Sequence, residues 1–178
     1  QIGEELMAKS TTYKVYDALM EYAQLFKHNM DKGDDKTDAG RTVASKGGQT
    51  KVTMVITEEV KDQMIADGIP DKSMGYDMFK GPDENGLYRY TAKRPWNSPF
   101  KDDDGAIVEF GEPNVVDYNA TVEAGEQVHW DSEVNIGNSS EGKVKLSIYK
   151  NGSKRIVRLE SVGITNLVEY VSNGEVRF

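Results

Sequence analysis

The stretch GKVKLSIYKNGSKRIVR, residues 142–158, places Asn151-Gly152 between two runs in which apolar and polar residues alternate. Such alternation is typical of β-strands with one buried face, and Asn-Gly between two strands is a strong signal of a hairpin with a two-residue type I′ turn. This turn implies a register in which Lys145 faces Arg158 and Leu146 faces Val157. The stretch therefore predicts a long antiparallel hairpin, around which the rest of the fold is arranged.

The predicted hairpin has one apolar face and one basic face. The inward face carries Val144, Leu146, Ile148, Val157 and Leu159, and the outward face carries Lys143, Lys145, Tyr149, Lys154 and Arg158. Like charges directly opposite one another, such as Lys145 and Arg158, destabilise an antiparallel pair by up to about 1 kcal/mol. The compensating partner is either a neighbouring acid such as Glu160 or an anionic ligand, for which Tyr149 offers a ring on which a base could stack.

Strand patterns recur along the rest of the chain. They cover residues 50–57, 86–93, 106–110 and 154–170, where β-branched or alternating residues lie between glycine-rich breaks. One helix is predicted after Thr57, which can cap it, and it ends before Gly68 and Pro70. Residues 16–26 fit either a helix or a first strand, and the polar segments 32–48 and 67–85 are expected to be long loops.

These elements predict an all-β protein with minor α content. Several short strands around one helix favour a small β-barrel or sandwich, and the OB-fold, a five-stranded Greek-key barrel, is the member of this class most often built in this way. The length of 178 residues suits a single domain. We assign this domain to residues 7–178, because MAKS from Met7 resembles a native start and residues 1–6 read as upstream or added sequence.

Composition excludes several classes of site. The chain has no cysteine and only two histidines, His28 and His129, so neither a disulfide framework nor a metal cluster is expected, and no cofactor is predicted. No apolar run approaches the ~20 residues of a membrane span, and no signal peptide is recognisable. We therefore expect a soluble, intracellular protein without a membrane partner.

The net charge of -8 argues against indiscriminate binding to nucleic acid, yet the charge is segregated along the chain. Residues 102–141 contain eleven acids and no lysine or arginine, whereas residues 86–101 and 142–158 contain no acid. Segment 86–101 mixes cations with aromatic rings: Arg89, Lys93, Arg94 and Lys101 with Tyr88, Tyr90, Trp96 and Phe100. The tyrosines could equally be core residues below a solvated strand face, but cations interleaved with rings are what single-stranded nucleic acid requires.

Catalytic motifs are absent from the sequence. No glycine-rich phosphate loop is present, and neither histidine lies in a motif typical of a general base. The cluster Asp31, Asp34, Asp35 and Asp38 could hold a magnesium ion, although a solvated loop is the simpler interpretation. We therefore predict that the protein is not an enzyme.

The C-terminal third resembles a known family. IGNSSEGKVKLSIYK (136–150) followed by VRLESVGITNLVEY (157–170) is similar to the single-stranded DNA-binding protein of short-tailed lytic bacteriophages of the T-seven type. In that family a glycine-rich turn precedes an alternating strand, and a last strand of similar pattern follows. GQTKVTMVIT (48–57) resembles the family's second strand, and the start at Met7 also fits.

The resemblance implies an OB-fold protein that coats single-stranded DNA during phage DNA replication, recombination and repair, in the cytoplasm of the infected bacterial host. It also implies a homodimer that works with the phage DNA polymerase and primase-helicase. The family's long acidic tail with a terminal phenylalanine has no counterpart in YVSNGEVRF, although Phe178 is the last residue. Residues 119–134 read as an insertion whose acids could counter the charge of the DNA-binding groove.

We predict that basic residues of the two acid-free segments contact phosphates and that bases stack on neighbouring rings. The candidate DNA-binding residues are Arg89, Tyr90, Lys93, Arg94, Trp96, Phe100, Lys143, Lys145, Tyr149, Lys154 and Arg158, with Tyr22, Phe26 and Lys27 as further candidates. Two other classes remain open. One is a structural β-sandwich protein of a virion, whose basic hairpin mediates self-assembly. The other is a magnesium-dependent nuclease or nucleotidyl transferase that uses the Asp31 cluster.

Overall fold

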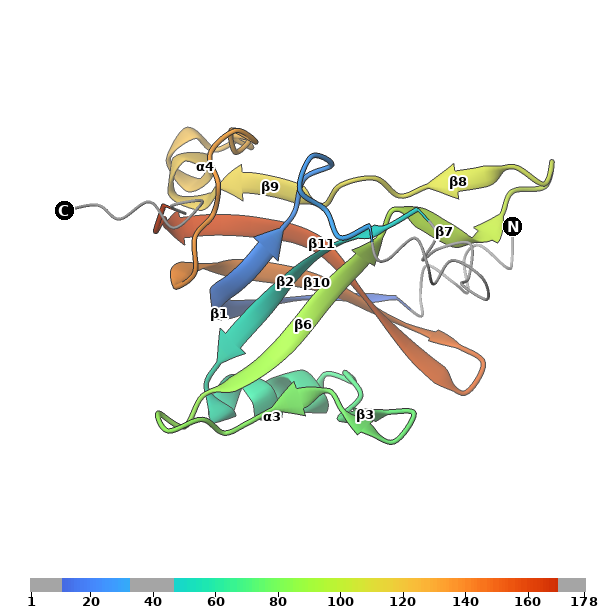
Figure 1. The fold of residues 1–178 in the computed structure, drawn as a ribbon, viewed down its shortest axis with the longest axis horizontal. Coiled ribbons are helices and arrows are strands. Elements are labelled where there is room, and N and C mark those ends of the chain that lie inside the picture. The colour runs from blue at the N-terminus through green and yellow to red at the C-terminus, as the bar shows by residue number, and fades with distance from the viewer. Residues whose placement is uncertain (1–10, 33–46, 170–178) are drawn as a thin grey trace.

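A computed structural model describes residues 11–32 and 47–169 of the chain, which fold mainly as strands (Figure 1). The main sheet has seven strands in the order β5-β6-β2-β1-β10-β11-β9. Their bounds are β1 Thr12–Gln24, β2 Gln49–Ile56, β5 Phe79–Lys80, β6 Tyr88–Pro95, β9 Asn114–Asp117, β10 Ser140–Asn151 and β11 Lys154–Asn166. Two small antiparallel ribbons, β3 (Lys72–Ser73) with β4 (Tyr76–Asp77) and β7 (Asn97–Lys101) with β8 (Ile107–Glu109), project from it.

The main sheet is mixed and strongly curved. Neighbouring strands are antiparallel except β9, which runs parallel to β11. β11 also lies against β6, near the opposite edge of the strand order, so the sheet curls back towards itself. The β10–β11 hairpin is long, and its tip extends beyond the curled body at the end where the β3–β4 ribbon lies (Figure 1).

The core fills the inside of this curved sheet. Alternate residues of the central strands point inward, and Met20, Met54 and Leu146 have no solvent exposure. α3 (Glu58–Ala66) covers one end of the core with Met64, which is also fully buried. Full burial of each such side chain stabilises the fold by about 1.5–3 kcal/mol. The positions of the surface residues described below depend on this packed interior.

Most of the predicted elements are confirmed. The four strand segments correspond to β2, β6, β8 and β11, and residues 16–26, which fitted either structure, belong largely to strand β1. The predicted helix is α3, and its cap is as expected because the Thr57 hydroxyl accepts a hydrogen bond from the Val60 N–H at 3.2 Å. A second helix, α4 (Tyr118–Ala124), was not predicted and lies in the acidic segment.

The register of the β10–β11 hairpin differs from the predicted one. Gly152 and Ser153 form the two-residue loop, so that Asn151 pairs with Lys154 and Ile148 pairs with Val157, two residues further along β11 than expected. Gly152 has a φ of 65°, as the first central position of a type II′ turn requires.

The predicted opposition of Lys145 and Arg158 is therefore wrong. Arg158 pairs with Ser147, and Lys145 pairs with Ser161 beyond a bulge that follows Leu146 and Leu159. Between the turn and this bulge the displacement is two residues, which keeps every side chain on its face because the side-chain period of a strand is two. The inward face is accordingly as predicted, and Leu146 and Leu159 have no solvent exposure.

Of the two segments predicted to be long loops, one contains short strands and the other lies mostly outside the described residues. Residues 67–85 contain the β3–β4 ribbon and the short edge strand β5 rather than a continuous loop. Most of residues 32–48 lies outside the described residues. In the part of the chain that the structure describes, no helix is long and apolar enough to span a membrane.

Candidate nucleic-acid interface

Two cavities open beside the β3–β4 ribbon and β11, one over β6 and the other at the tip of the β10–β11 hairpin. One, of about 560 Å³, has Tyr76, Lys80 and Lys93 in its lining. The other, of about 620 Å³, is bounded by Lys72–Met74 on one side and Ser153–Arg155 on the other. Because both cavities are bounded by the β3–β4 ribbon and by β11, we treat them as one surface and name it the basic cleft.

Lysines and arginines dominate the lining of the basic cleft. They are Lys72, Lys80, Arg89, Lys93, Lys150, Lys154 and Arg155, and the lining contains one acid, Asp77. Within the described residues, Lys80, Lys93, Lys150 and Lys154 form no ion pair, whereas Lys72 lies 3.8 Å from Asp77. In a chain of net charge -8, the basic cleft is a local site for an anion.

One pair of cations in the basic cleft is directly opposed. Lys150 faces Arg155 across the hairpin, next to the turn. Among the described residues, the Arg155 guanidinium donates a single long hydrogen bond, 3.4 Å, to the carbonyl of Gly68. Like charges at facing positions destabilise a strand pair, so an anion bound between them would relieve the repulsion. The sequence argument about opposed cations thus applies to this pair rather than to Lys145 and Arg158.

The tip of the β3–β4 ribbon places apolar and aromatic side chains beside these cations. Its two-residue loop is Met74-Gly75, and Met74 has a φ of 52°, a conformation that is strained for a residue with a side chain. The Met74 side chain is 94% exposed and that of Tyr76 is 70% exposed. An exposed ring beside lysines can stack on an unpaired base, and an exposed methionine can insert between bases.

Arg89, a predicted phosphate ligand, is already held by two carboxylates. Its guanidinium donates to Glu21 at 2.9 Å and to Asp83 at 2.8 Å. The hydrogen bonds to Glu21 and Asp83 raise the pKa of Arg89. The hydrogen bond from Arg89 lowers the pKa of Asp83. Arg89 therefore lies at the edge of the basic cleft but mainly ties the 83–87 turn to β1.

Arg94 and Arg158 belong to a partly buried cluster outside the basic cleft. The Arg94 guanidinium donates to the carbonyls of Phe110 (2.9 Å), Gly111 (3.1 Å) and Leu159 (3.2 Å). Burial lowers the pKa of Arg94. Arg158 lies over the Phe110 ring, 4.2 Å from its centroid. These contacts join β6, β11 and the 110–111 turn, so both guanidinium groups have structural partners.

Glu160 carries the negative charge of this cluster. Its carboxylate accepts hydrogen bonds from Arg158 at 2.8 Å and from the Ser147 hydroxyl at 2.7 Å, and Arg94 lies 3.4 Å away. Burial alone would raise the pKa of Glu160, but the Arg158 and Ser147 hydrogen bonds and the two positive charges outweigh burial and lower it. Glu160 is thus the acid that compensates Arg158, as the sequence suggested as one alternative.

The outward residues Lys143, Lys145 and Tyr149 of β10 do not line the basic cleft, although the hollow beside Tyr149 shares Lys150 and Arg155 with it. Lys143 pairs with Asp17 at 2.6 Å, which raises the pKa of Lys143. The Lys145 ammonium lies 5.4 Å from the centroid of the Tyr13 ring. Tyr149 is half-buried and lines a smaller hollow of about 240 Å³ next to the hairpin. Of the predicted hairpin residues, Lys154 lies in the basic cleft itself.

Most of the predicted stacking residues are not exposed rings in the basic cleft. Tyr90 forms part of its floor but packs against Phe79, and burial raises the pKa of Tyr90 to about 12. Phe26 is buried, and Trp96 is half-buried below the Lys27 ammonium, 5.7 Å from the ring centroid. Tyr22 is exposed but lines a different cavity. The side chain of Phe100 lies outside the described residues.

The structure thus brings Lys93 and Lys154 together with six residues that sequence reasoning did not propose. They are Lys72, Met74, Tyr76, Lys80, Lys150 and Arg155. Lys150 and Arg155 carried a signal, because they flank the turn of the hairpin in the acid-free segment. The remaining residues carried little sequence signal, since the β3–β4 ribbon turns at Met74-Gly75 rather than at a standard Asn-Gly pair.

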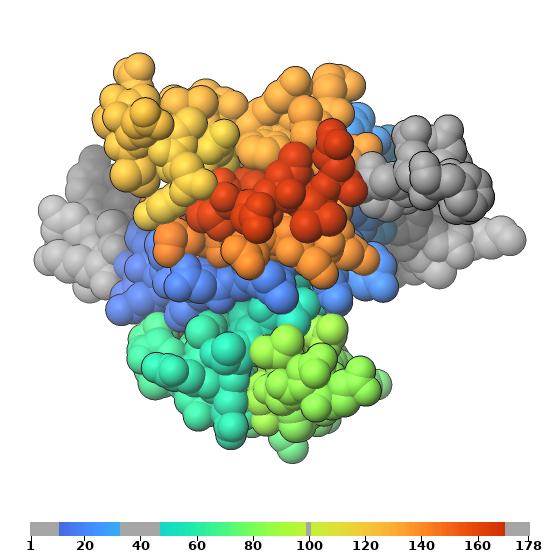
Figure 2. Space-filling view, turned by 90° about the vertical axis from the view of Figure 1, so that its left-hand side faces the viewer, coloured from blue at the N-terminus to red at the C-terminus, as the bar shows by residue number. Residues whose placement is uncertain are grey.

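The acidic segment predicted to counter the groove lies at the other end of the molecule. Figure 2 shows the face that carries α4 and the residues after it, gathered over the end of β11. The tip of the β10–β11 hairpin lies at the opposite end (Figure 1). No group of three potential metal ligands occurs among the residues that the structure describes. Asp31 is the only described member of the predicted magnesium cluster, and it pairs with Lys51 at 3.0 Å.

Comparison with known proteins gives a likeness in structure only. No protein-family model and no curated protein sequence matches the chain. Among solved structures, it is similar to the single-stranded DNA-binding protein from bacteriophage Enc34, with a TM-score of 0.50 and 11% sequence identity over 95% of this chain and 88% of that chain. A C-terminal truncation of that protein gives a TM-score of 0.48 and 11% identity over 90% of this chain and 88% of that chain. At this identity the likeness shows that the chain shares the mainly β fold of that phage protein.

Proposed function

We propose that this chain is an OB-fold protein that binds single-stranded DNA in the basic cleft. The strand order supports the OB-fold proposal: β1, β2 and β6 form a meander, β10 pairs with β1, β11 pairs with β10, and β11 lies against β6. These five strands fit the five-stranded, partly open Greek-key barrel that we propose. The likeness to the Enc34 protein supports a shared fold.

The observation that carries the proposal is the location of the basic cleft. OB-folds bind oligonucleotides on the face of strands 2 and 3 and between the loop that joins strands 1 and 2 and the loop that joins strands 4 and 5. In this chain strands 2 and 3 are β2 and β6, and the loop between strands 4 and 5 is the tip of the β10–β11 hairpin. The basic cleft lies between these two parts.

The chemistry of the basic cleft suits a single strand. Lys93, Lys150 and Lys154 offer ammonium groups to phosphates, and the Tyr76 ring offers a surface on which one base can stack. Stacking of this kind contributes about 1–3 kcal/mol per base and depends little on base identity. Binding of the strand in this cleft should therefore be strongly salt-dependent and have slight sequence preference.

The biological setting proposed for this activity rests on the sequence resemblance. We infer that the protein coats single-stranded DNA during phage DNA replication, recombination and repair in the host cytoplasm, without catalysing a reaction itself. A homodimer, and contacts with the phage DNA polymerase and primase-helicase, belong to the same proposal. Binding to a single strand is the part that the basic cleft supports.

Fluorescence anisotropy of a labelled oligo-dT strand tests the proposal. Neither tryptophan lines the basic cleft, so a label on the DNA is a better reporter than protein fluorescence. We expect saturable binding in EDTA and much weaker binding to a duplex of the same length. Salt-screened self-association without any rise in anisotropy would instead favour the structural virion protein, and magnesium-dependent turnover would favour the nuclease.

A further inference from the structure

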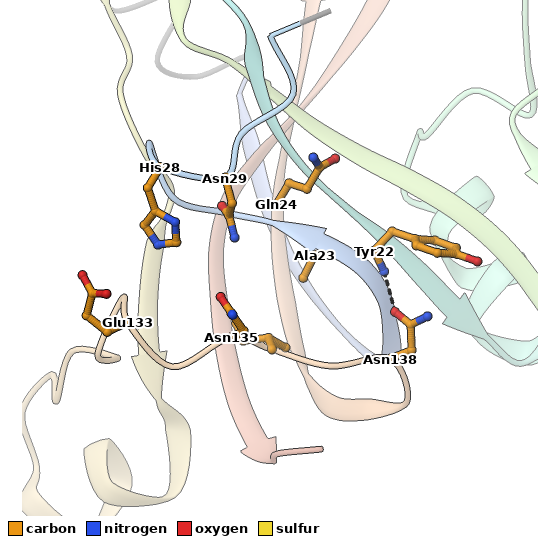
Figure 3. Close-up of a pocket in the computed structure, with 9 residues that line it drawn as sticks. Tyr22, Ala23, Gln24, His28, Asn29, Glu133, Asn135 and Asn138 are labelled. Carbon is orange, nitrogen blue, oxygen red and sulfur yellow. Dashed lines mark hydrogen bonds between the residues drawn. The ribbon is translucent and has the colours of Figure 1, made fainter. Parts of the chain in front are cut away.

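Another cavity, of about 750 Å³, lies between the end of β1 and the segment that precedes β10 (Figure 3). Four carboxamide side chains belong to its lining: Gln24, Asn29, Asn135 and Asn138. Asn29 and Asn135 point toward one another across the gap in Figure 3, and His28 and Glu133 lie beside them. We name this cavity the amide pocket. It has no place in the proposed DNA-binding mechanism.

The two walls of the amide pocket are held together by hydrogen bonds. The Asn138 side-chain oxygen accepts from the Tyr22 N–H at 2.8 Å, and the Ser139 N–H donates to the Met20 carbonyl at 2.8 Å. His28 donates through Nε2 to the Ser132 carbonyl, also at 2.8 Å. These contacts connect β1 and the turn after it with the 132–139 segment, so the pocket is formed before any ligand enters.

The backbone at the edge of the amide pocket is strained. Tyr22 has a φ of 52° at an irregularity in the pairing of β1 with β2, and its side chain is 68% exposed. A bulky residue in this region of φ costs of order 1–3 kcal/mol and persists where its surroundings hold it, here through Asn138. Such strain is concentrated at binding sites, where it fixes the position of polar groups.

The chemistry of the lining excludes some ligands and favours others. The lining contains no lysine or arginine and one acid, Glu133, so a phosphate would be repelled. A carboxamide presents a donor and an acceptor side by side, which matches the edge of a nucleobase. The oxygens of Asn29 and Asn138 already accept from the N–H groups of Phe26 and Tyr22, so these two side chains offer a ligand mainly their amide N–H donors. The side chain of Asn135 forms no hydrogen bond with any described residue, so its donor and acceptor are available to a ligand. Gln24 also forms none, but in Figure 3 its side chain points away from Asn29 and Asn135, so it borders the pocket without facing this gap.

We propose that the amide pocket binds a nucleobase. Adenine is the best match, because asparagine and glutamine pair with its amino group and ring nitrogen through two hydrogen bonds. The volume of about 750 Å³ is within the range of small-ligand sites and large enough for a nucleoside. The base can come from a bound DNA strand, which rests on the proposed function, or from a free nucleoside, which does not.

Side-chain amide signals of asparagine and glutamine in ¹H–¹⁵N NMR spectra test this proposal on the full chain. Adenosine, an uncharged probe, should shift the signals of Asn29 and Asn135 in a saturable manner. Asn135→Ala should weaken adenosine binding about tenfold, as expected for loss of a two-bond contact to a base. Asn85→Ala is the matched control, because Asn85 is an exposed asparagine outside the amide pocket.

The proposal is overturned if adenosine shifts none of these signals, or if Asn135→Ala binds adenosine as tightly as the unmodified chain. The source of the base is resolved with labelled homopolymers. If the strand supplies the base, the unmodified chain prefers oligo-dA to oligo-dT, and Asn135→Ala removes the preference. If a free nucleoside is the ligand, adenosine binds without displacing the oligonucleotide. If the proposed DNA-binding function is wrong, no oligonucleotide binds, whereas adenosine can still bind in the amide pocket. The two proposals can therefore fail separately.

Discussion

Neutralising two lysines of the basic cleft should flatten the salt dependence of DNA binding by a predictable amount. Lys80, Lys93, Lys150 and Lys154 line the cleft and form no ion pair with described residues. Each phosphate contact to a single strand contributes about 0.7 to the slope of log K against log salt concentration, so four contacts give a slope of about -2.8. Affinity for oligo-dT should then fall about 50-fold between 50 and 200 mM salt.

The double variant Lys93→Gln, Lys154→Gln removes two of the four contacts. Its slope should be about -1.4, so the same change in salt should reduce affinity only about sevenfold. Lys143→Gln is the matched control, because Lys143 is paired with Asp17 outside the cleft and its loss should leave the slope unchanged. Anisotropy titrations at four salt concentrations measure all three slopes. An unchanged slope in the double variant, or an equal decrease in Lys143→Gln, would refute the assignment of phosphates to the basic cleft.

Three further predictions concern a stacking ring and the buried cluster. Tyr76→Ala should weaken oligo-dT binding by about 1–3 kcal/mol, whereas Tyr13→Ala, which removes another exposed ring outside the cleft, should not. Equal effects of the two substitutions in anisotropy titrations would count against stacking. Arg94→Met should lower the free energy of unfolding, measured in urea, by about 3 kcal/mol, because three carbonyls lose the guanidinium as a hydrogen-bond donor. The same variant should leave the salt slope of DNA binding unchanged. A stable variant with a flatter slope would show instead that Arg94 contacts phosphate. Folding lowers the pKa of Glu160 from its ordinary 4.5, so the ionised carboxylate stabilises the native state above about pH 4.5, and this contribution is lost as the pH falls below that value. In urea titrations from pH 6 to pH 3, Glu160→Gln should therefore lose less stability than the unmodified chain. Parallel stability profiles of the two proteins would contradict this role of Glu160.

The hairpin shows what periodicity can and cannot determine. Alternation identified the buried face correctly, because apolar residues occupy every second position of both strands near Leu146 and Leu159, and these two side chains are fully buried in the core. The register depended on the turn, and both Asn151-Gly152 and Gly152-Ser153 satisfy a two-residue loop, the first as type I′ and the second as type II′. Two acceptable turns shift the partner of each residue by two positions without changing its face.

The candidate site was harder to predict than the fold, because the fate of a cation depends on distant residues. Arg94 lies on the opposite face of β6 from Lys93, and what fixes its role is its hydrogen bonds to the carbonyls of residues 110, 111 and 159, which the sequence does not place near it. Arg89 is neutralised by Glu21, which is far away in sequence. Conversely, Tyr76 looked like part of a loop and lies in the basic cleft only because a two-residue ribbon presents it there.

Photocrosslinking tests the central claim, that a single DNA strand occupies the basic cleft, most directly. Oligo-dT with 5-iodouracil at each position, irradiated in complex with the protein and analysed by mass spectrometry, marks aromatic residues that stack on bases. If the strand occupies the cleft, the peptide that contains Tyr76 should be crosslinked. Tyr76→Ala should remove this crosslink, whereas Tyr76→Phe should remove it only if the hydroxyl takes part. Crosslinks confined to rings outside the cleft, such as Tyr13 or Tyr118, would contradict it.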